Sequence, residues 1–255
     1  MSMTHDDAAR LLGLDPPRSV PRPDAVAVVR AALDGEPQES GDLDGLAFPD
    51  FLAAVAAAAA DAVRRLRRSE LPEGVLEDSL ADVGRKVRLY GDDGIRGWLI
   101  DILRGEVIAL GRLQFERRTT RFGRHIHIPE LGPLDPGSVD AALDRARRFF
   151  ADGAGFCCAS WMLDPRLLRL GDGSNIVRFQ RRFRIVTPPG ESHEPGEGDR
   201  SVAKFVFRRP LEAVLGSHSE PASSLQRLVL DVLRSGEHWT EPLGVLHDSA
   251  AHEEG

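Results

Sequence analysis

The hydrophobic periodicity changes from helix-like to strand-like at residue 107, and this change limits the chain to a two-part fold. Before it, apolar side chains recur at helical spacing, as in Val75, Leu76, Leu80, Val83 and Val87. After it, Leu113 and Phe115 alternate with polar neighbours, which is the repeat of a half-buried strand. We therefore expect an α+β or α/β protein with a helical N-terminal domain over residues 1–105, a mixed β-sheet domain flanked by helices over 106–240, and a flexible tail over 241–255.

The second half contains a β-α-β unit. Residues 107–115 and 124–128 are expected to form a hairpin, and Pro136 opens the helix that follows. An apolar strand is expected at 156–163, so the strands on either side of the helix should be parallel with a right-handed crossover. The remaining expected elements are a helix from Ser174 to about residue 182, strands at 183–187 and 201–207, and a closing helix at 223–234.

Charge and cysteine content narrow the functional classes. The formal net charge of −7 argues against nucleic-acid and anionic-membrane partners, and the longest apolar run, residues 51–60, is too short to cross a bilayer. Cys157 and Cys158 are adjacent and offer no disulfide framework, which favours a reducing, cytoplasmic setting. The polar N-terminus, residues 1–10, does not resemble a signal peptide. No Cys/His spacing suits a structural zinc site, so no metal is expected.

The segment 129–139 is the strongest candidate for a ligand site. A strand that enters a helix through a Gly/Pro turn presents N–H groups at the helix start, and these suit a pyrophosphate. Neither G-x-G-x-x-G nor G-x-x-x-x-G-K-[ST] is present, so the Rossmann and P-loop patterns do not apply. An ordinary connection between two elements remains the alternative interpretation.

Several polar side chains could carry proton transfer. Glu116 and His127 are chemically suited to accept a proton from an amine, and His125 shares a strand face with His127. The alternative is a surface glutamate and a hydrogen-bonded strand histidine. Cys157 and Cys158 are better explained as buried core than as nucleophiles.

Short fragments in a fixed order resemble one known group of proteins. The fragments are L-G-R-L-Q-F-E at 110–116, H-I-P at 127–129, G-P-L at 132–134, S-W with D-P at 160–165, and S-N-I at 174–176 followed by R-F-Q-R-R-F at 178–183. Together they resemble two-domain acyltransferase-like proteins, which have a helical N-acyltransferase N-terminal domain and a GNAT-like C-terminal domain. The resemblance covers about residues 107–208 by motif and extends more loosely over the helical half.

The resemblance implies an acyl-CoA site between the strands at 124–128 and 156–163. Acetyl-CoA or another acyl-CoA would be the co-substrate, with its pantetheine along the backbone of Ile126, His127 and Ile128. Its pyrophosphate would meet the loop at Leu131, Gly132 and Leu134. A backbone N–H near His127 or Ile128 would polarise the thioester carbonyl.

The same resemblance implies roles in proton transfer. Glu116 and His127 would be the base candidates, and Ser174 or Asn175 would assist the leaving thiolate. Two features depart from the usual pattern of the group. Pro133 removes a backbone donor from the loop, and the single tyrosine, Tyr90, falls in the helical half.

Two functions follow as hypotheses. The first is an acyl-CoA-dependent, N-acetyltransferase-like enzyme that acylates a small-molecule or peptide amine. The second is a catalytically weak or inactive GNAT-like module that binds a ligand and regulates a partner. The sequence leaves the acceptor, the acyl chain length and the oligomeric state open.

Overall fold

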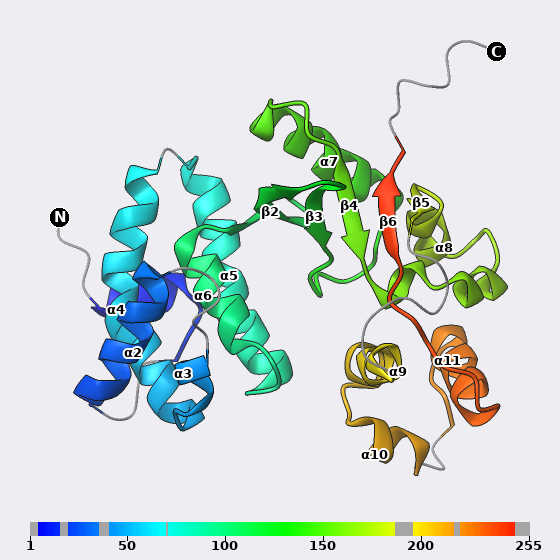
Figure 1. Ribbon diagram of the computed structural model, residues 1–255, viewed down its shortest axis with the longest axis horizontal. Coiled ribbons are helices and arrows are strands. Elements are labelled where there is room, and N and C mark those ends of the chain that lie inside the picture. Colours follow the sequence, from blue (N-terminus) through cyan, green and yellow to red (C-terminus); the bar gives the residue numbers. More distant parts are fainter. Residues whose placement is uncertain are drawn as a thin grey trace. The chain divides into compact units, whose positions relative to one another are not determined.

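A computed structural model describes residues 5–15, 20–35, 41–69, 71–186, 196–216 and 220–247. The chain divides into two compact units (Figure 1). The first comprises Met1–Leu110 and Gln114–Arg117, and the second comprises Gly111–Leu113 and Arg118–Gly255. The helical half followed by a mixed sheet with flanking helices confirms the predicted fold class.

Helices build the first unit. They are α1 (His5–Leu11), α2 (Pro23–Asp34), α3 (Gly41–Asp44), α4 (Phe48–Arg68), α5 (Glu73–Tyr90) and α6 (Arg96–Arg104). The alanine-rich face of α4 is buried, which suits a helix packed closely by its neighbours. The arginines at its C-terminal end are exposed, and three of them form ion pairs, Arg64 with Asp61, Arg65 with Asp34, and Arg67 with Glu73. These arginines are therefore a solvated helix end.

Buried polar contacts fix α5 to the first strands. The hydroxyl of Ser79 accepts a hydrogen bond from the N–H of Ala109 at 2.8 Å. The fully buried carboxylate of Asp82 accepts one from Nε2 of Gln114 at 2.9 Å. Because a buried polar group is costly without a partner, these bonds define one position for α5 on β1 (Val107–Ala109) and the start of β2 (Gln114–Thr120).

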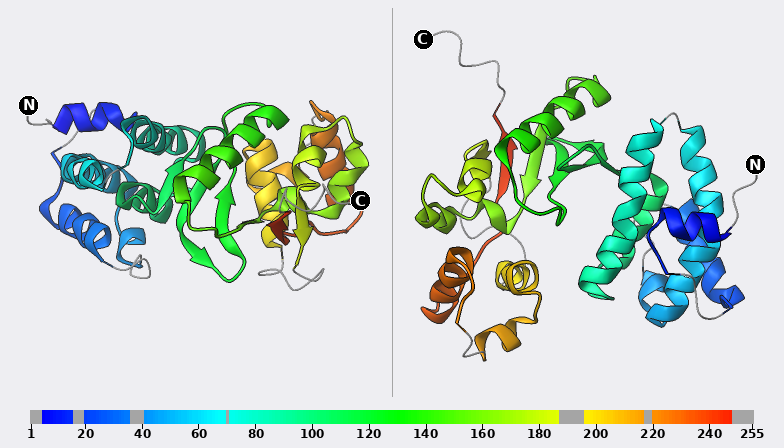
Figure 2. Two further views of the ribbon diagram at one scale, coloured as in Figure 1. Left: turned by 90° about the horizontal axis from the view of Figure 1, so that it is seen from above. Right: turned by 180° about the vertical axis from the view of Figure 1, so that it is seen from behind.

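The sheet has six strands in the order β1-β2-β3-β4-β6-β5. The other strands are β3 (Gly123–His127), β4 (Phe156–Ala159), β5 (Phe183–Ile185) and β6 (Leu243–Leu246). β3 and β4 are parallel and are joined through α7 (Pro136–Phe150), which lies along one face of the sheet (Figure 2). The expected β-α-β unit is therefore present, but the region 107–115 contains two strands, and β4 ends at Ala159 rather than at residue 163.

The expected tail at 241–255 contains a strand, which corrects that prediction for four residues. β6 lies between β4 and β5, with Cys158 opposite Gly244 and Arg184 opposite Val245. A Cβ on Gly244 would lie 2.8 Å from side-chain atoms of Leu163 and Phe183, so the strand needs glycine there. Its partners are far away in sequence, which is why a four-residue apolar run gave no local signal. Residues 248–255 lie outside the described part of the chain.

The expected strand at 201–207 is also wrong. Residues Glu197–Val202 form helix α9, and Ala203–Phe207 form a π-helix, η3. Val202 and Ala203 are fully buried, and Val206 and Phe207, four residues further on, pack against the same hydrophobic region. This i, i+4 pairing is a helical pattern, and the aromatic and β-branched residues concealed it.

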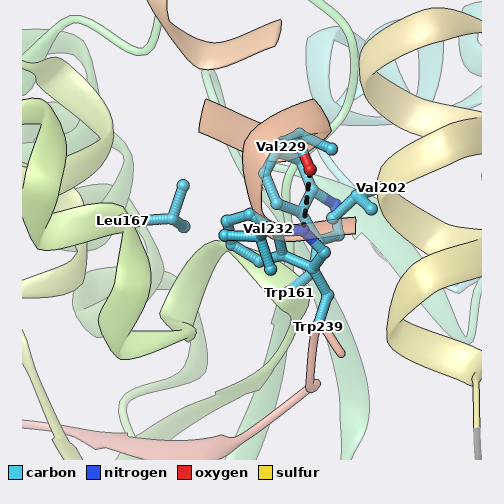
Figure 3. Packing of buried hydrophobic residues seen from close by; sticks show 6 residues of the cluster. All are labelled: Trp161, Leu167, Val202, Val229, Val232 and Trp239. Atoms are coloured by element: carbon cyan, nitrogen blue, oxygen red, sulfur yellow. Dashed lines mark hydrogen bonds between the residues drawn. The ribbon is translucent and has the colours of Figure 1, made fainter. Parts of the chain in front are cut away.

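Two further helices complete a helical lobe, α10 (Leu211–Leu215) and α11 (Ser224–Arg234). With α9 they gather beyond the carboxyl end of β4 (Figures 1 and 2). Their core includes Trp161, Leu167, Val202, Val229, Val232 and Trp239 (Figure 3). Trp161 and Leu167 belong to the short 3₁₀ helices η1 (Trp161–Leu163) and η2 (Pro165–Leu170), so the lobe packs directly on the segment that follows β4.

Candidate active site

The parallel strands β3 and β4 pair only at their beginnings. Arg124 lies opposite Phe156 and His125 opposite Cys157, and the ladder between the described strands extends no further. β3 nevertheless continues to His127, and β4 continues to Ala159 with β6 as its neighbour. In open α/β sheets ligands bind at the carboxyl ends of parallel strands, so the end of this ladder is the first place to look for a site.

The direction of the backbone shows which groups of β3 face β4. The N–H of Arg124 donates to the carbonyl of Gly155 at 2.8 Å, so the main-chain groups of Arg124 point toward β4. Because main-chain direction alternates along a strand, Ile126 and Ile128 point their N–H and C=O groups the same way, past the end of the ladder. The main-chain groups of His127 point toward the opposite neighbour. Of the predicted backbone positions, Ile126 and Ile128 therefore have the better orientation.

The two histidines of β3 lie on one face, as the alternation predicted. Their rings are stacked with centroids 6.5 Å apart. The other face carries Ile126, which is buried, and Arg124, whose guanidinium lies 4.0 Å from the ring centroid of Phe150 in α7. His127 is consequently half-buried on the face away from α7.

Arg112 organises the loop between β3 and α7. Its guanidinium donates hydrogen bonds to three loop carbonyls, from Nη1 to Pro129 at 2.8 Å, from Nη2 to Gly132 at 2.9 Å, and from Nε to Pro133 at 3.2 Å. Burial lowers the pKa of this guanidinium from its usual value. In a trans peptide unit the N–H points opposite to the C=O, so the N–H of Leu134 faces away from Arg112. Arg112 thus holds the carbonyl groups of the loop toward itself and leaves the N–H of Leu134 on the opposite side.

The first turn of α7 carries its own cap. Asp135 accepts hydrogen bonds from the N–H of Ser138 at 2.9 Å and from its hydroxyl at 3.1 Å, and Pro136 opens the helix. The backbone hydrogen bond from Ser138 is the main reason why the pKa of Asp135 lies below its usual value. A carboxylate already occupies the position that a phosphate group would take at this helix start. A positive charge also reaches this turn, since Arg182 donates to the carbonyl of Pro136 at 3.4 Å.

The predicted loop residues differ in exposure. Leu131 is exposed. Gly132 has φ +81°, and apart from its two chain neighbours no described residue lies within 4 Å of the place where a Cβ would stand, so the chain is open to solvent there. Leu134 is buried, and only its main chain is positioned to bind a ligand.

Ser174 and Asn175 lie at the start of α8 (Asn175–Gln180). Ser174 occupies the N-cap position, but its hydroxyl makes no capping hydrogen bond within the described residues. Both side chains are half-buried. The hydroxyl of Ser174 is therefore not committed to the helix and remains a proton donor by chemistry.

Glu116 belongs to a different unit from the other predicted catalytic residues. It lies on β2 opposite Val107, within the first unit, and is half-buried. His127, Ser174 and Asn175 all belong to the second unit. The structure brings the last three into one folded unit and leaves Glu116 as a separate candidate.

The cysteine pair is core. Cys157 and Cys158 are both buried and free, and desolvation is the main cause that raises the pKa of Cys158 far above its usual value. A thiol held in its neutral form is a poor nucleophile. Among the described residues, no group of three or more His, Cys, Asp or Glu side chains is placed to hold a metal ion. Likewise, no described helix has the length and apolar character that crossing a membrane requires.

Sequence reasoning missed Arg112 as an organiser of the loop and a histidine–carboxylate pair at His238 and Asp199. Arg112 lies inside the fragment at 110–116, but its function depends on carbonyls at least 17 residues away. The pair joins residues 39 positions apart, and no spacing rule connects them.

Comparison with known proteins gives a consistent result. Residues 107–246 match the family described as the GNAT-like C-terminal domain. No curated protein sequence matches the chain. Among solved structures, an acyltransferase in complex with decanoyl-CoA and teicoplanin shares 30% identity at a TM-score of 0.73, covering 95% of this chain and 87% of the other.

Two more solved structures show the same similarity. A tryptophan-to-alanine mutant of an acyltransferase in complex with octanoyl-CoA has 29% identity and a TM-score of 0.73, with 95% of this chain and 87% of the other covered. An acyltransferase in complex with decanoyl-CoA has 26% identity and a TM-score of 0.68, with 96% and 99% covered. The similarity therefore extends over both halves of the chain.

Proposed function

Because the chain belongs to the family of GNAT-like C-terminal domain proteins, we propose that it is an acyl-CoA-dependent acyltransferase that acylates an amine. The observation that carries the proposal is the early end of the β3–β4 ladder, which leaves the main chain of Ile126 and Ile128 directed toward β4 without a ladder there. An extended pantetheine can pair with such a strand edge. The similarity to acyltransferases solved with decanoyl-CoA and octanoyl-CoA supports acyl-CoA as the donor.

The chemistry assigns a role to each candidate group. The acceptor nitrogen attacks the thioester carbon, a C–N bond forms, and the C–S bond breaks. Glu116 or His127 accepts the proton that the nitrogen loses, and the N–H of Ile128 stabilises the developing oxyanion. Ser174 or Asn175 donates a hydrogen bond to the departing thiolate, which is then protonated.

The loop at Leu131, Gly132 and Leu134 is the proposed pyrophosphate site. Arg112 supports this assignment because it holds the loop carbonyls away from the ligand side. The carboxylate of Asp135 opposes it, since it would repel a phosphate at the helix start. Asp135 is also the observation that favours the second candidate function, a GNAT-like module that binds ligands and regulates a partner without efficient catalysis.

Three finer features complete the proposal. The similarity to a complex with teicoplanin supports a small-molecule acceptor. Complexes with decanoyl-CoA and octanoyl-CoA support a donor longer than acetyl-CoA. The free thiols of Cys157 and Cys158 support a cytoplasmic location, because thiols stay reduced there.

Replacing the base candidates tests the catalytic assignment. The variants are Glu116→Gln and His127→Ala. The variant that lacks the base is expected to lose about 10²–10⁴-fold in turnover number, while its affinity for the donor stays unchanged. Thiol release reports turnover, and calorimetric titration with decanoyl-CoA reports affinity. His125→Ala, on the same strand face, is the matched control and should stay near the normal rate. Normal rates in both test variants would remove Glu116 and His127 from the mechanism.

Replacing Arg112 tests the loop. Arg112→Met removes the donors for three loop carbonyls, so the loop should lose its fixed conformation and the dissociation constant for decanoyl-CoA should rise about tenfold or more, which corresponds to about 1.4 kcal/mol. Arg67→Met, which removes only an exposed ion pair in the first unit, is the control. An unchanged dissociation constant in Arg112→Met would mean that the donor does not bind at this loop.

A further inference from the structure

His238 and Asp199 form a hydrogen-bonded pair that the proposed mechanism does not use. Nδ1 of His238 lies 2.7 Å from Oδ2 of Asp199. The carboxylate is buried, with a side chain 6% exposed, whereas the imidazole is 75% exposed. This asymmetry distinguishes the pair from the exposed ion pairs elsewhere in the second unit, such as Arg181 with Asp172.

The pair fixes one tautomer of the ring. Asp199 also accepts the N–H of Trp239 through Oδ1 at 2.7 Å, so both carboxylate oxygens are used as acceptors. An ionised carboxylate can only accept, so the proton of the neutral imidazole resides on Nδ1. Nε2 then presents a lone pair to solvent, which is the arrangement of a histidine held as a proton acceptor.

The backbone around the ring is held firmly. Trp239 is 2% exposed and packs in the hydrophobic core shown in Figure 3, where its Nε1 donates to the carbonyl of Val229 at 3.5 Å. Thr240 donates its N–H to Asp164 at 2.9 Å. Gly198 packs against the main chain of Trp239 so closely that a Cβ would lie 2.1 Å from its carbonyl oxygen. Asp199 and His238 are therefore presented by two segments in fixed contact.

The segment that follows His238 leads to the carboxyl end of β4. Trp239 shares its core with Trp161, which follows β4 by two residues. The N–H of Ser160 donates to the carbonyl of Pro242 at 3.3 Å, and Leu243 pairs with Ala159, the last residue of β4. The chain from His238 to Leu243 thus leads from the core of the helical lobe to the carboxyl end of β4, and the carboxyl ends of parallel strands form the ligand-binding edge of such sheets.

We propose that His238, oriented by Asp199, accepts the proton that an amine acceptor brings to the site as an ammonium ion. This inference depends on the proposed acyl transfer. An alkylammonium group has a pKa of about 10, so at neutral pH its nitrogen lacks the lone pair needed for attack. Nε2 takes that proton and releases it to solvent. After the C–N bond has formed, the nitrogen loses its second proton to Glu116 or His127, and the thiolate gains one, so the sum is amide, free thiol and one proton.

Helix α9 carries two charged residues besides Asp199, Glu197 and Arg200, and Glu237 precedes His238 in the chain. Glu237 accepts a hydrogen bond from Nε of Arg166 at 3.0 Å. The carboxylate of Asp199 is the charged group in hydrogen-bond contact with the imidazole.

The test compares acceptors that differ in protonation. Decanoyl-CoA is the donor, and the acceptors are benzylamine, an ammonium ion at neutral pH, and aniline, a free base at neutral pH. In His238→Gln, kcat/KM for benzylamine at pH 7 should fall by about 10²-fold, and the deficit should shrink as the pH rises toward the pKa of the ammonium group. With aniline the variant should match the unsubstituted protein. Asp199→Asn should show the same pH dependence, because an amide can donate to Nδ1 and select the other tautomer.

His247→Gln, which replaces an exposed histidine after β6, is the control and should leave both rates unchanged. Because the ring of His238 is exposed, His238→Gln should keep the melting temperature of the unsubstituted protein. Thermal unfolding therefore shows whether a loss of activity comes from unfolding. A deficit that is the same for both acceptors at every pH, or no deficit at all, would overturn this inference alone. An unsubstituted protein that acylates neither amine would refute the proposed function and this inference with it.

Discussion

Replacing Asp164 with alanine is expected to lower the free energy of unfolding by about 3–5 kcal/mol, because it leaves buried polar groups without their partner. The carboxylate is fully buried. It accepts from the N–H and hydroxyl of Thr240 at 2.9 and 2.8 Å, and from the N–H of Arg166 at 2.9 Å. The guanidinium of Arg166 also binds it at 3.1 Å. Asp164 therefore joins η2 to the segment that leads into β6.

Urea denaturation measures the free energy of unfolding of Asp164→Ala. The control is Asp172→Ala, which removes a carboxylate that is 76% exposed and paired with Arg181, and it should cost less than about 1 kcal/mol. Asp164→Asn, which keeps one acceptor oxygen, should fall between the two. Equal stability of Asp164→Ala and Asp172→Ala would show that the buried network contributes little.

Replacing Gly123 with alanine is expected to affect both stability and donor binding. Gly123 has φ +109°, and a Cβ there would lie 2.2 Å from the carbonyl oxygen of Gly155. The backbone strain costs about 1–3 kcal/mol, and forcing the overlap apart costs about 1–3 kcal/mol more. The obstacle is main chain at the first pair of the β3–β4 ladder, so relief requires the two strands to shift.

Gly153→Ala separates the two effects in Gly123→Ala. Gly153 also has a positive φ, +72°, but apart from its two chain neighbours no described residue lies within 4 Å of its Cβ position, so only the strain should appear. Thermal unfolding should therefore show a larger decrease for Gly123→Ala. Its affinity for decanoyl-CoA should also fall, because Ile126 and Ile128 follow on the displaced strand. Equal melting temperatures for the two variants would mean that the ladder tolerates the displacement.

Local patterns predicted the long elements well. The helical spacing from Val75 to Val87 indicated α5, and Pro136 marked the first residue of α7. The alternation at 124–128 placed β3 and put His125 and His127 on one face. Each of these features depends on residues within a few positions of one another, which is the range that periodicity and capping rules cover.

The missed features all depend on distant contacts. β6 is a strand because Gly244 fits against Leu163 and Phe183 between two other strands, and its sequence alone is only a short apolar run. The segment 201–207 has strand-forming residues but folds as a helix because the core lies on one side of it. Arg112 acquires its role from carbonyls of a loop that comes later in the chain, and only the tertiary structure brings them together.

Thermal unfolding with CoA, acetyl-CoA, octanoyl-CoA and decanoyl-CoA tests the proposed acyl-CoA-dependent function most directly. A ligand present at ~100 times its dissociation constant adds about 2.7 kcal/mol to the free energy of unfolding. For a chain of 255 residues this raises Tm by about 5–10 °C. We expect such a rise, largest with decanoyl-CoA or octanoyl-CoA, and expect it to be reduced in Arg112→Met. An unchanged Tm with all four compounds would contradict the proposed function.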